Sequence, residues 1–207
     1  MKNLLSFRKC CGFFLLLVFV LILAAFPSRC PADDGKQAVE VIPPPPAHYF
    51  NDYAGVVSTA TASRLNSLLE NHERETSDQI VVAIFPKMQS TSPVKEYTLR
   101  IANSWKVGQK GKNNGVSLFL FVQDRKLYVQ VGTGLEKALP YATCQQILDT
   151  KIIPHLKKGD YDAALGAGVN ALIAATKGTF QGNGQTAADT KSATTNTTSP
   201  AGKTSPP

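Results

Sequence analysis

The chain has 207 residues, of which 43% are hydrophobic, enough for one folded domain with a buried core. This composition excludes a protein that is disordered throughout. The net charge is +7 and charged residues make up 18%, below the ~25% of a typical globular protein, while 13 prolines and 15 glycines indicate that part of the chain lies outside a core.

Residues 1–32 have the three parts of a secretory signal peptide. Lys2, Arg8 and Lys9 precede an apolar run over residues 13–26, and a small-residue site ends at Ala32. The run is shorter than the roughly 20 residues that span a bilayer. We therefore predict cleavage after Ala32 and a secreted or periplasmic protein; retention of residues 13–26 as a membrane anchor is the alternative.

Removal of this segment changes both the charge and the cysteine count. The segment carries four of the 22 basic residues and no acidic residue, which leaves 18 basic against 15 acidic residues and a net charge of +3. The basic charge therefore mostly serves targeting, and nucleic acid is not an expected partner. Cys144 would be the one remaining cysteine, and its helical spacing with Ile147 and Leu148 predicts a small buried side chain rather than a catalytic thiol.

Two polar segments flank the predicted domain, which covers residues 49–180. Residues 33–48 end in four consecutive prolines and an Ala-His pair, and we predict an extended spacer with nothing to bury. Residues 181–207 contain no aromatic residue and no apolar residue larger than alanine. Such a composition predicts a disordered polar tail.

The sequence of the first half of the domain predicts a helix, a strand and a second helix. Ser58 is an N-cap residue, and the helix after it ends near Glu75. Residues 79–85 form a continuous apolar run, typical of a strand that is covered on both faces. Pro93 begins the second helix, whose apolar stripe ends at Trp105, and we expect Trp105 to be largely buried beneath the sheet.

The sequence of the second half predicts two strands followed by two helices. Residues 116–122 and 126–131 are predicted strands, and the short connection between them favours a hairpin. Helices are predicted over residues 141–156 and 160–176. This order of elements predicts an α/β fold, a single-domain α/β/α sandwich with a small mixed sheet.

The polar loops of the domain hold the candidate functional residues. They are the acidic residues Asp52, Asp124 and Glu136, the amides Asn113 and Asn114, and the cation Arg125. Parallel strands would place Asp52, Asp124 and Arg125 at one edge of the sheet and the other three at the opposite edge. A longer excursion of residues 106–114 would instead bring Asn113, Asn114 and Glu136 to Asp52, and the sequence leaves both arrangements open. Their oxygen ligands suit calcium or magnesium and not zinc.

Several motifs in register resemble the TPM domain family over about residues 49–176. They are Asp52-Tyr53-Ala54-Gly55, Lys112-Asn113-Asn114-Gly115, Asp124-Arg125-Lys126 and Gly132-Thr133-Gly134-Leu135-Glu136. The resemblance implies an α/β/α sandwich that acts mainly outside the cytoplasm, in a family that includes a thylakoid-lumen protein of photosystem II repair. Members of this family have been called phosphatases, some bind calcium or magnesium, and others are accessory subunits or assembly factors.

Two functions follow from these residues and from the resemblance. The first is an extracytoplasmic accessory or assembly module that acts on a protein partner. In this module Asp52, Asp124 and Glu136 bind a divalent cation, calcium or magnesium, and Asn113, Asn114 and Arg125 bind a ligand. The alternative is a metal-dependent phosphatase with Asp52, Asp124 and Arg125 as catalytic candidates. The sequence has no recognisable phosphatase nucleophile motif, which favours binding over catalysis.

Overall fold

The computed structural model describes residues 40–186 and residue 189. The predicted signal peptide at residues 1–32 and most of the predicted tail at residues 181–207 lie outside the described residues. In the part of the chain that is described, no helix combines the length and the apolar character needed to cross a membrane.

A four-stranded sheet forms the centre of the domain, with the strands in the order β1-β2-β3-β4. The strands are β1 (Phe50–Asp52), β2 (Gln79–Phe85), β3 (Gly115–Phe121) and β4 (Lys126–Val131). The first three are parallel to one another, and β4 pairs antiparallel with β3. The predicted hairpin and the predicted mixed sheet are therefore confirmed.

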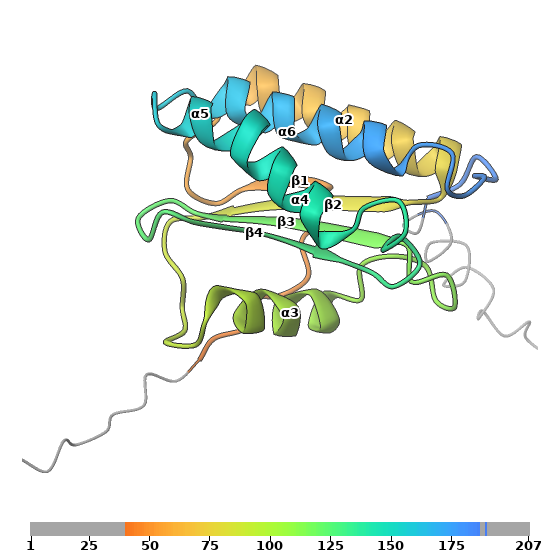
Figure 1. Cartoon of the computed structure of the whole chain (residues 1–207), viewed down its shortest axis with the longest axis horizontal. Helices are drawn as coiled ribbons and strands as arrows, with labels where there is room; N and C mark the ends of the chain where they lie inside the picture. Colours follow the sequence, from red (N-terminus) through yellow and green to blue (C-terminus); the bar gives the residue numbers. More distant parts are fainter. Residues whose placement is uncertain (1–39, 187–188, 190–207) are drawn as a thin grey trace, which may run out of the picture. The chain divides into compact units, whose positions relative to one another are not determined.

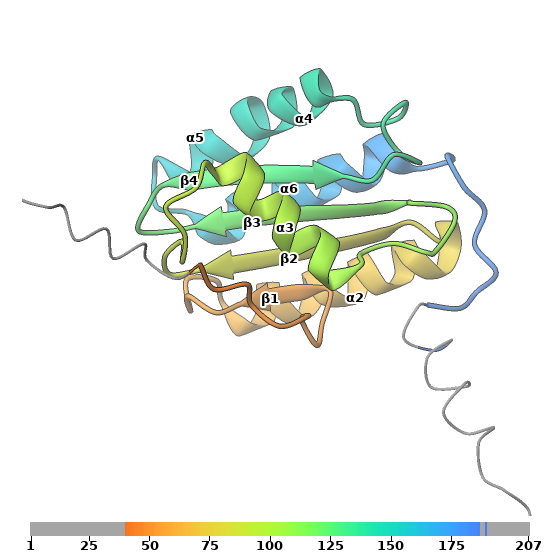
Figure 2. The ribbon, with the colours of Figure 1, turned by 90° about the horizontal axis from the view of Figure 1, so that it is seen from below.

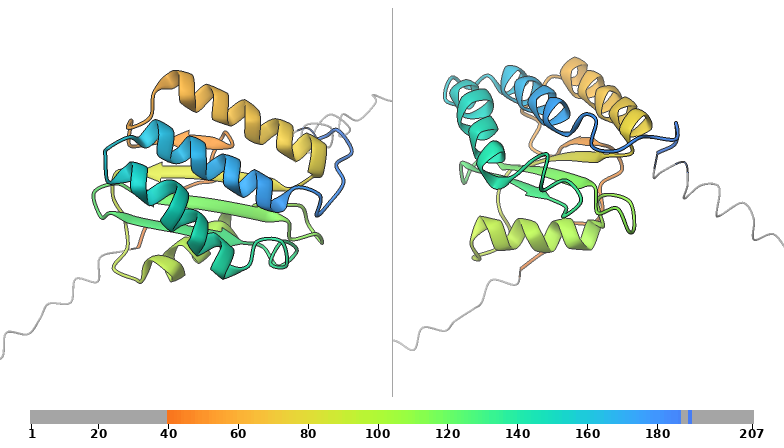
Figure 3. Two further views of the ribbon diagram at one scale, coloured as in Figure 1. Left: turned by 45° about the horizontal axis from the view of Figure 1, so that its top comes forward. Right: turned by 45° about the vertical axis from the view of Figure 1, so that its right-hand side comes forward.

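Helices cover both faces of this sheet (Figure 1). One face carries α2 (Thr59–Thr76), α6 (Tyr161–Thr176) and an irregular helix composed of α4 (Tyr141–Ile147), η1 (Leu148–Ile152) and α5 (Ile153–Leu156). The opposite face carries α3 (Val94–Trp105). Both views in Figure 3 show the same layers, which confirms the predicted α/β/α sandwich.

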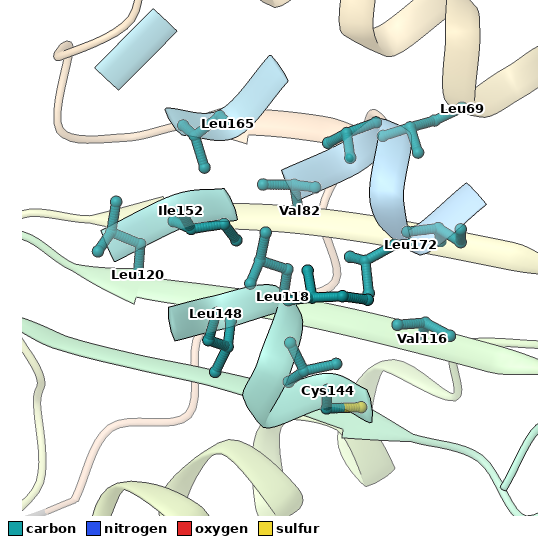
Figure 4. Packing of buried hydrophobic residues seen from close by; sticks show 14 of the residues in the cluster. Leu69, Val82, Val116, Leu118, Leu120, Cys144, Leu148, Ile152, Leu165 and Leu172 are labelled. Carbon is teal, nitrogen blue, oxygen red and sulfur yellow. The ribbon is translucent and has the colours of Figure 1, made fainter. Parts of the chain in front are cut away.

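The two layers of helices define two hydrophobic cores. Alternate side chains of the strands, such as Val82, Leu118 and Val129, face α2, α6 and α4 in the larger core, part of which Figure 4 shows. The intervening residues, such as Val81 and Phe119, face α3 in the smaller core. Because both faces are covered, every residue of β3 is buried, as the continuous apolar sequence predicts.

The local sequence explains where the helices begin and where one of them is irregular. The Ser58 hydroxyl accepts a hydrogen bond from the Thr61 N–H at 3.3 Å and caps α2. The Asp160 carboxylate accepts one from the Ala163 N–H at 2.9 Å and caps α6. The predicted helix 141–156 contains wider π-type turns at η1, just before Pro154, which has no N–H to donate to the preceding turn.

Residues 40–43, which we expected to belong to a spacer, instead pack against the domain. The Val41 N–H donates to the Gln89 carbonyl at 3.1 Å, and Ile42 contacts the smaller core. The Trp105 indole N–H donates to the Pro43 carbonyl at 2.8 Å. Trp105 is 6% exposed, so its predicted burial is confirmed, and residues 40–43 are part of what covers it. We call residues 40–43 the strap.

The beginning of the predicted tail also packs against the domain. The Gly182 N–H donates to the Glu75 carbonyl at 2.8 Å, and the Gly184 N–H donates to the Arg74 carbonyl at 3.2 Å. A side chain at Gly182 would meet the Arg74 carbonyl oxygen at 2.2 Å, so this close approach requires glycine. The described chain therefore continues to follow the end of α2 beyond Phe180.

Candidate functional site

The parallel strands end at one edge of the sheet, which we call the C-terminal edge. Asp52 is the last residue of β1 and pairs with Ile84, one residue before the end of β2. Asp124 and Arg125 lie in the hairpin that follows β3, which ends at the same edge. The first of the two arrangements that the sequence left open is therefore the one observed for these three residues.

The Asp52 carboxylate is engaged by the backbone of its own loop. One oxygen accepts hydrogen bonds from the N–H groups of Ala54 at 3.0 Å and Gly55 at 2.8 Å, and the other accepts one from Val57 at 2.8 Å. Gly55 has a φ of +65°, which lets the loop turn around the carboxylate. Asp52 thus fixes the connection between β1 and α2.

Asp124 has a comparable role between two loops. Its carboxylate accepts a hydrogen bond from the Met88 N–H at 2.6 Å and so joins the hairpin to the loop that follows β2. Arg125 occupies the left-handed position of the hairpin, with a φ of +52°. Strands β1 and β3 lie on either side of β2, so Asp52 and Asp124 follow strands that are separated by β2.

An aromatic side chain stands at the same edge. Tyr53 is 49% exposed and stacks on Phe85, with 5.0 Å between ring centroids and 18° between ring planes. Phe85 in turn stacks on Phe121 at 5.8 Å, which connects the surface ring to the smaller core. Tyr53 is therefore held by the interior although half of it faces solvent.

Asn113, Asn114 and Glu136 lie at the opposite, N-terminal edge of the sheet. Asn113 and Asn114 immediately precede β3, and the Asn113 carbonyl accepts a hydrogen bond from the Gly134 N–H at 3.1 Å. Glu136 follows two residues later in the loop after β4. The N-terminal and C-terminal edges are separated by seven-residue strands, roughly 20 Å in length.

The three predicted metal ligands consequently do not surround one point. Asp52 and Asp124 are at the C-terminal edge, and Glu136 is at the other. Among the described residues, no group of three histidine, cysteine, aspartate or glutamate side chains is placed to hold a metal ion. The set of donors has the oxygen chemistry of a calcium or magnesium site, but its geometry does not fit a single cation, and metal binding stays a prediction.

Asn114 and its neighbours form a buried polar cluster that the sequence did not indicate. The Asn114 amide donates to the Ser77 carbonyl at 2.6 Å and to the Asp78 carboxylate at 3.2 Å, and its oxygen accepts from the Gln109 N–H at 2.9 Å. The Lys112 ammonium donates to the Ser77 hydroxyl at 3.0 Å. Asn114 thus ties two loops together and is not free to contact a partner.

Asp78 is the least satisfied member of this cluster. Its side chain is fully buried, and one carboxylate oxygen has no hydrogen-bond partner among the described residues. Burial raises the pKa of Asp78 to about 6, although the Asn114 hydrogen bond and the Lys112 charge act in the opposite direction. From the sequence, Asp78 is expected in a turn between a helix and a strand, because no neighbouring residue indicates that its side chain is buried.

A groove of about 460 Å³ follows the outer edge of β4. Its lining comes from β4, from the loop and helix that follow it, and from the first turn of α3, namely Lys95, Tyr128, Val129, Gln130, Val131, Glu136, Leu139, Pro140, Tyr141 and Cys144. Tyr141 is 69% exposed. Glu136 is the one sequence-predicted candidate that the structure places in this groove.

We expect the thiol of Cys144 to be inert in the folded protein. The side chain is 4% exposed, and burial raises the pKa of the thiol to about 11. Modification of Cys144 by a disulfide reagent at pH 8, followed by peptide mapping, should be at least about 100-fold slower in buffer than in denaturant. Equal rates in the two solvents would show that Cys144 is accessible.

The family model TPM_phosphatase, described as the TPM domain, matches residues 50–175. A comparison with curated proteins gave no match. The solution NMR structure of the N-terminal domain of a protein from P. gingivalis is 30% identical, with a TM-score of 0.58, and the match covers 64% of this chain and 84% of that one.

Two further NMR structures are similar in fold. The BA42 protein from the psychrophilic bacterium Bizionia argentinensis is 17% identical with a TM-score of 0.54, over 63% of this chain and 88% of that one. The N-terminal domain of cg2496 protein from Corynebacterium glutamicum is 14% identical with a TM-score of 0.50, over 68% and 86%. The family match spans more than half of the chain, and the chain therefore belongs to the TPM domain family.

Proposed function

We propose that the domain is a non-catalytic accessory module that binds a protein partner in a periplasmic or other extracytoplasmic compartment. One observation carries this proposal. Asp52 is the first candidate for phosphatase chemistry, and its carboxylate accepts hydrogen bonds from three backbone N–H groups of its own loop. A nucleophile or a base that positions water needs oxygen atoms directed at the substrate. Asp52 instead acts as a structural residue of the loop.

The neighbouring candidates support the same conclusion. The Asp124 carboxylate accepts a hydrogen bond from the Met88 N–H. Asp124 and Asp52 follow strands that lie on opposite sides of β2. A metal-dependent phosphatase gathers its carboxylates around the reacting phosphoryl group. What this edge offers a partner is the half-exposed ring of Tyr53, and aromatic side chains anchored in this way are frequent centres of protein interfaces.

Weak binding of calcium or magnesium is a second part of the proposal. At the C-terminal edge a cation would meet the carboxylate of Asp52 or that of Asp124 and not a group of three, and with so few ligands we expect a dissociation constant of about 10⁻⁴–10⁻³ M. Calcium at ten times that constant should raise the free energy of unfolding by about 1.4 kcal/mol. Unchanged melting temperatures at millimolar calcium and magnesium would exclude this part and leave the partner-binding part intact.

An Asp52→Asn variant tests the structural role against the catalytic one. Asparagine presents one oxygen and one NH₂ group to the three N–H donors of the loop, so we expect a loss of about 1–3 kcal/mol in the free energy of unfolding. Hydrolysis of an aryl phosphate with magnesium should be indistinguishable from the buffer blank for both proteins. Turnover by the unchanged protein that is abolished in Asp52→Asn would establish the phosphatase alternative instead.

A further inference from the structure

We propose that the outer edge of β4, which pairs with no strand among the described residues, binds an extended segment of the partner protein as a fifth strand of the sheet. In this complex, basic side chains of the segment face the α4 side of the groove and acidic side chains face the α3 side. The inference rests on the proposed function, because it states how the partner is bound. Strand addition of this kind combines backbone hydrogen bonds with pockets for alternate side chains.

The backbone of β4 presents hydrogen-bonding groups at this edge. β4 is the last strand of the sheet, and after it the Gly132 N–H donates to the Gly115 carbonyl of β3 at 2.7 Å. In an antiparallel pair the residues that bond to the neighbour alternate along the strand. The backbone groups of Leu127, Val129 and Val131 therefore point away from β3, toward the groove.

The sequence of this edge does not protect it against pairing. Exposed edges are usually blunted by charged residues, prolines or bulges. Apart from Lys126 at its first position, β4 contains no charged residue and no proline, and it pairs with β3 in continuous register. The groove beside it is lined along residues 128–131, which corresponds to about 13 Å of extended chain.

The lining of the groove includes an acidic residue, Glu136, and a basic residue, Lys95. The side chain of Val129 belongs to the core beneath α4, as does Leu139, and Glu136 lies three residues before Leu139 in the same loop. The side chain of Gln130 points to the other face, where its amide donates to the Lys95 carbonyl at 2.8 Å. Because side chains of a bound strand also alternate, one set meets Glu136 and the apolar lining, and the other set meets Lys95.

The position of α4 favours a single extended segment over a second copy of this chain. Figure 2 shows that α4 projects beyond β4 when the sheet is viewed face on. Two copies that paired through β4 would place both α4 helices above the same two strands, which are about 4.8 Å apart. Packed helices need 8–10 Å between their axes, so these helices would collide. A lone strand brings no such helix.

Peptide binding by isotope-labelled full-length protein tests the proposal. The probe is the acetylated and amidated hexapeptide Val-Thr-Lys-Glu-Val-Thr, which places valine and lysine on one side and glutamate on the other. We expect amide shift changes centred on residues 127–131 and 136–144, with slower hydrogen exchange at Leu127, Val129 and Val131. N-methylation of the peptide at the residues that face β4 should weaken binding about tenfold.

Matched controls test two parts of the proposal separately: the placement of the charges and the location of the binding surface. The peptide Val-Thr-Glu-Lys-Val-Thr has the same composition with the charges exchanged and should bind at least about fivefold more weakly. Tyr141→Ala should weaken binding about fivefold, whereas Val41→Ala, which changes an exposed side chain of the strap outside the groove, should not change it. Both side chains are largely exposed, so both variants should keep a melting temperature close to that of the unchanged protein.

Four results would overturn the inference: no binding at millimolar peptide, equal binding of the N-methylated peptide, shift changes centred on Tyr53 and Asp124, or dimerisation through β4. These failures are distinct from failure of the proposed function. Binding at Tyr53 would preserve a partner-binding module and reject strand addition, while phosphate hydrolysis that depends on Asp52 would reject the non-catalytic function itself.

Discussion

A chain that begins at residue 44 should be about 2–4 kcal/mol less stable to unfolding than a chain that begins at residue 40. The shorter chain lacks the strap, whose carbonyl groups satisfy two largely buried donors. The Tyr97 hydroxyl donates to the Val41 carbonyl at 2.6 Å, and the Trp105 indole donates to the Pro43 carbonyl at 2.8 Å. Loss of Ile42 also uncovers apolar surface of the smaller core.

The single tryptophan makes this prediction direct to measure. Trp105 is the one tryptophan of the chain, so urea unfolding followed by its fluorescence and by circular dichroism reports on the region that the strap covers. The emission of the folded shorter chain should shift to longer wavelength, because water replaces Pro43. A Val41→Ala variant of the longer chain is the control, since this side chain is 48% exposed and should contribute little.

Equal unfolding midpoints and equal emission for the two chains would contradict the structure and return residues 40–43 to the role of a spacer. The ion pair of the strap gives an independent check. The Glu40 carboxylate accepts two hydrogen bonds from the Arg100 guanidinium, at 2.6 and 2.5 Å. These bonds, together with one from the Ser90 hydroxyl, hold the pKa of Glu40 well below its usual range, at about 2. High salt should therefore reduce the difference between the two chains without abolishing it.

The strap shows why the sequence was misleading at this point. Locally, two apolar residues followed by four prolines have nothing to pack against. Their partners Tyr97 and Trp105 are 56 and 62 residues away in the chain. Composition reports only on the local properties of a segment. The buried Tyr97 hydroxyl and Trp105 N–H on α3 need hydrogen-bond acceptors, and the strap supplies them only once the domain has folded.

Elements with a strong local signal were predictable. β2 spans the same residues as the predicted strand, and α3 runs from the residue after Pro93 to Trp105, as its apolar stripe indicates. β1 was missed, because three residues have no periodicity to detect and exist as a strand through pairing with β2. β3 begins and ends one residue earlier than predicted, which leaves the sheet unchanged.

For the candidate site, the sequence predicted where the candidate residues lie in the fold better than it predicted what their side chains do. One of the two arrangements that it left open placed Asp52 and Asp124 at one edge of the sheet, because parallel strands end together, and the structure has this arrangement. The sequence could not show whether a loop carboxylate points at a ligand or at its own backbone, since turns and binding loops use the same residue types. In the structure the Asp52 carboxylate points at three N–H groups of its own loop.

An Asp78→Asn variant should be more stable than the unchanged protein at neutral pH. Burial raises the pKa of the Asp78 carboxyl to about 6 from its ordinary 3.8, so the folded state binds this proton more tightly than the unfolded state. The contribution of Asp78 to the free energy of unfolding is therefore most favourable below pH 4, falls between pH 4 and 6, and stays level above pH 6. The charged form costs the fold up to about 3 kcal/mol.

Asparagine removes this charge and keeps the shape of the side chain. Its oxygen can still accept the hydrogen bond from Asn114, while its NH₂ group occupies the position of the carboxylate oxygen that has no partner among the described residues. That buried donor offsets part of the gain, so the net increase at pH 7.5 should be about 1–2 kcal/mol. At pH 4 the variant should show no gain, because Asp78 is already protonated in the folded protein.

Urea unfolding of both proteins at pH 4, 5, 6 and 7.5 tests this prediction, and Asp162→Asn is the control of opposite sign. Hydrogen bonds from the Ser58 hydroxyl and N–H lower the pKa of Asp162, so its contribution to stability is present at neutral pH and is lost as the pH falls. Asp162→Asn should therefore destabilise the protein at pH 7.5 and less so in acid. If Asp78→Asn instead destabilises the protein at pH 7.5, the carboxylate is paired in the folded state, and the Lys112 ammonium, which now bonds to Ser77, is the cation within reach to pair with it.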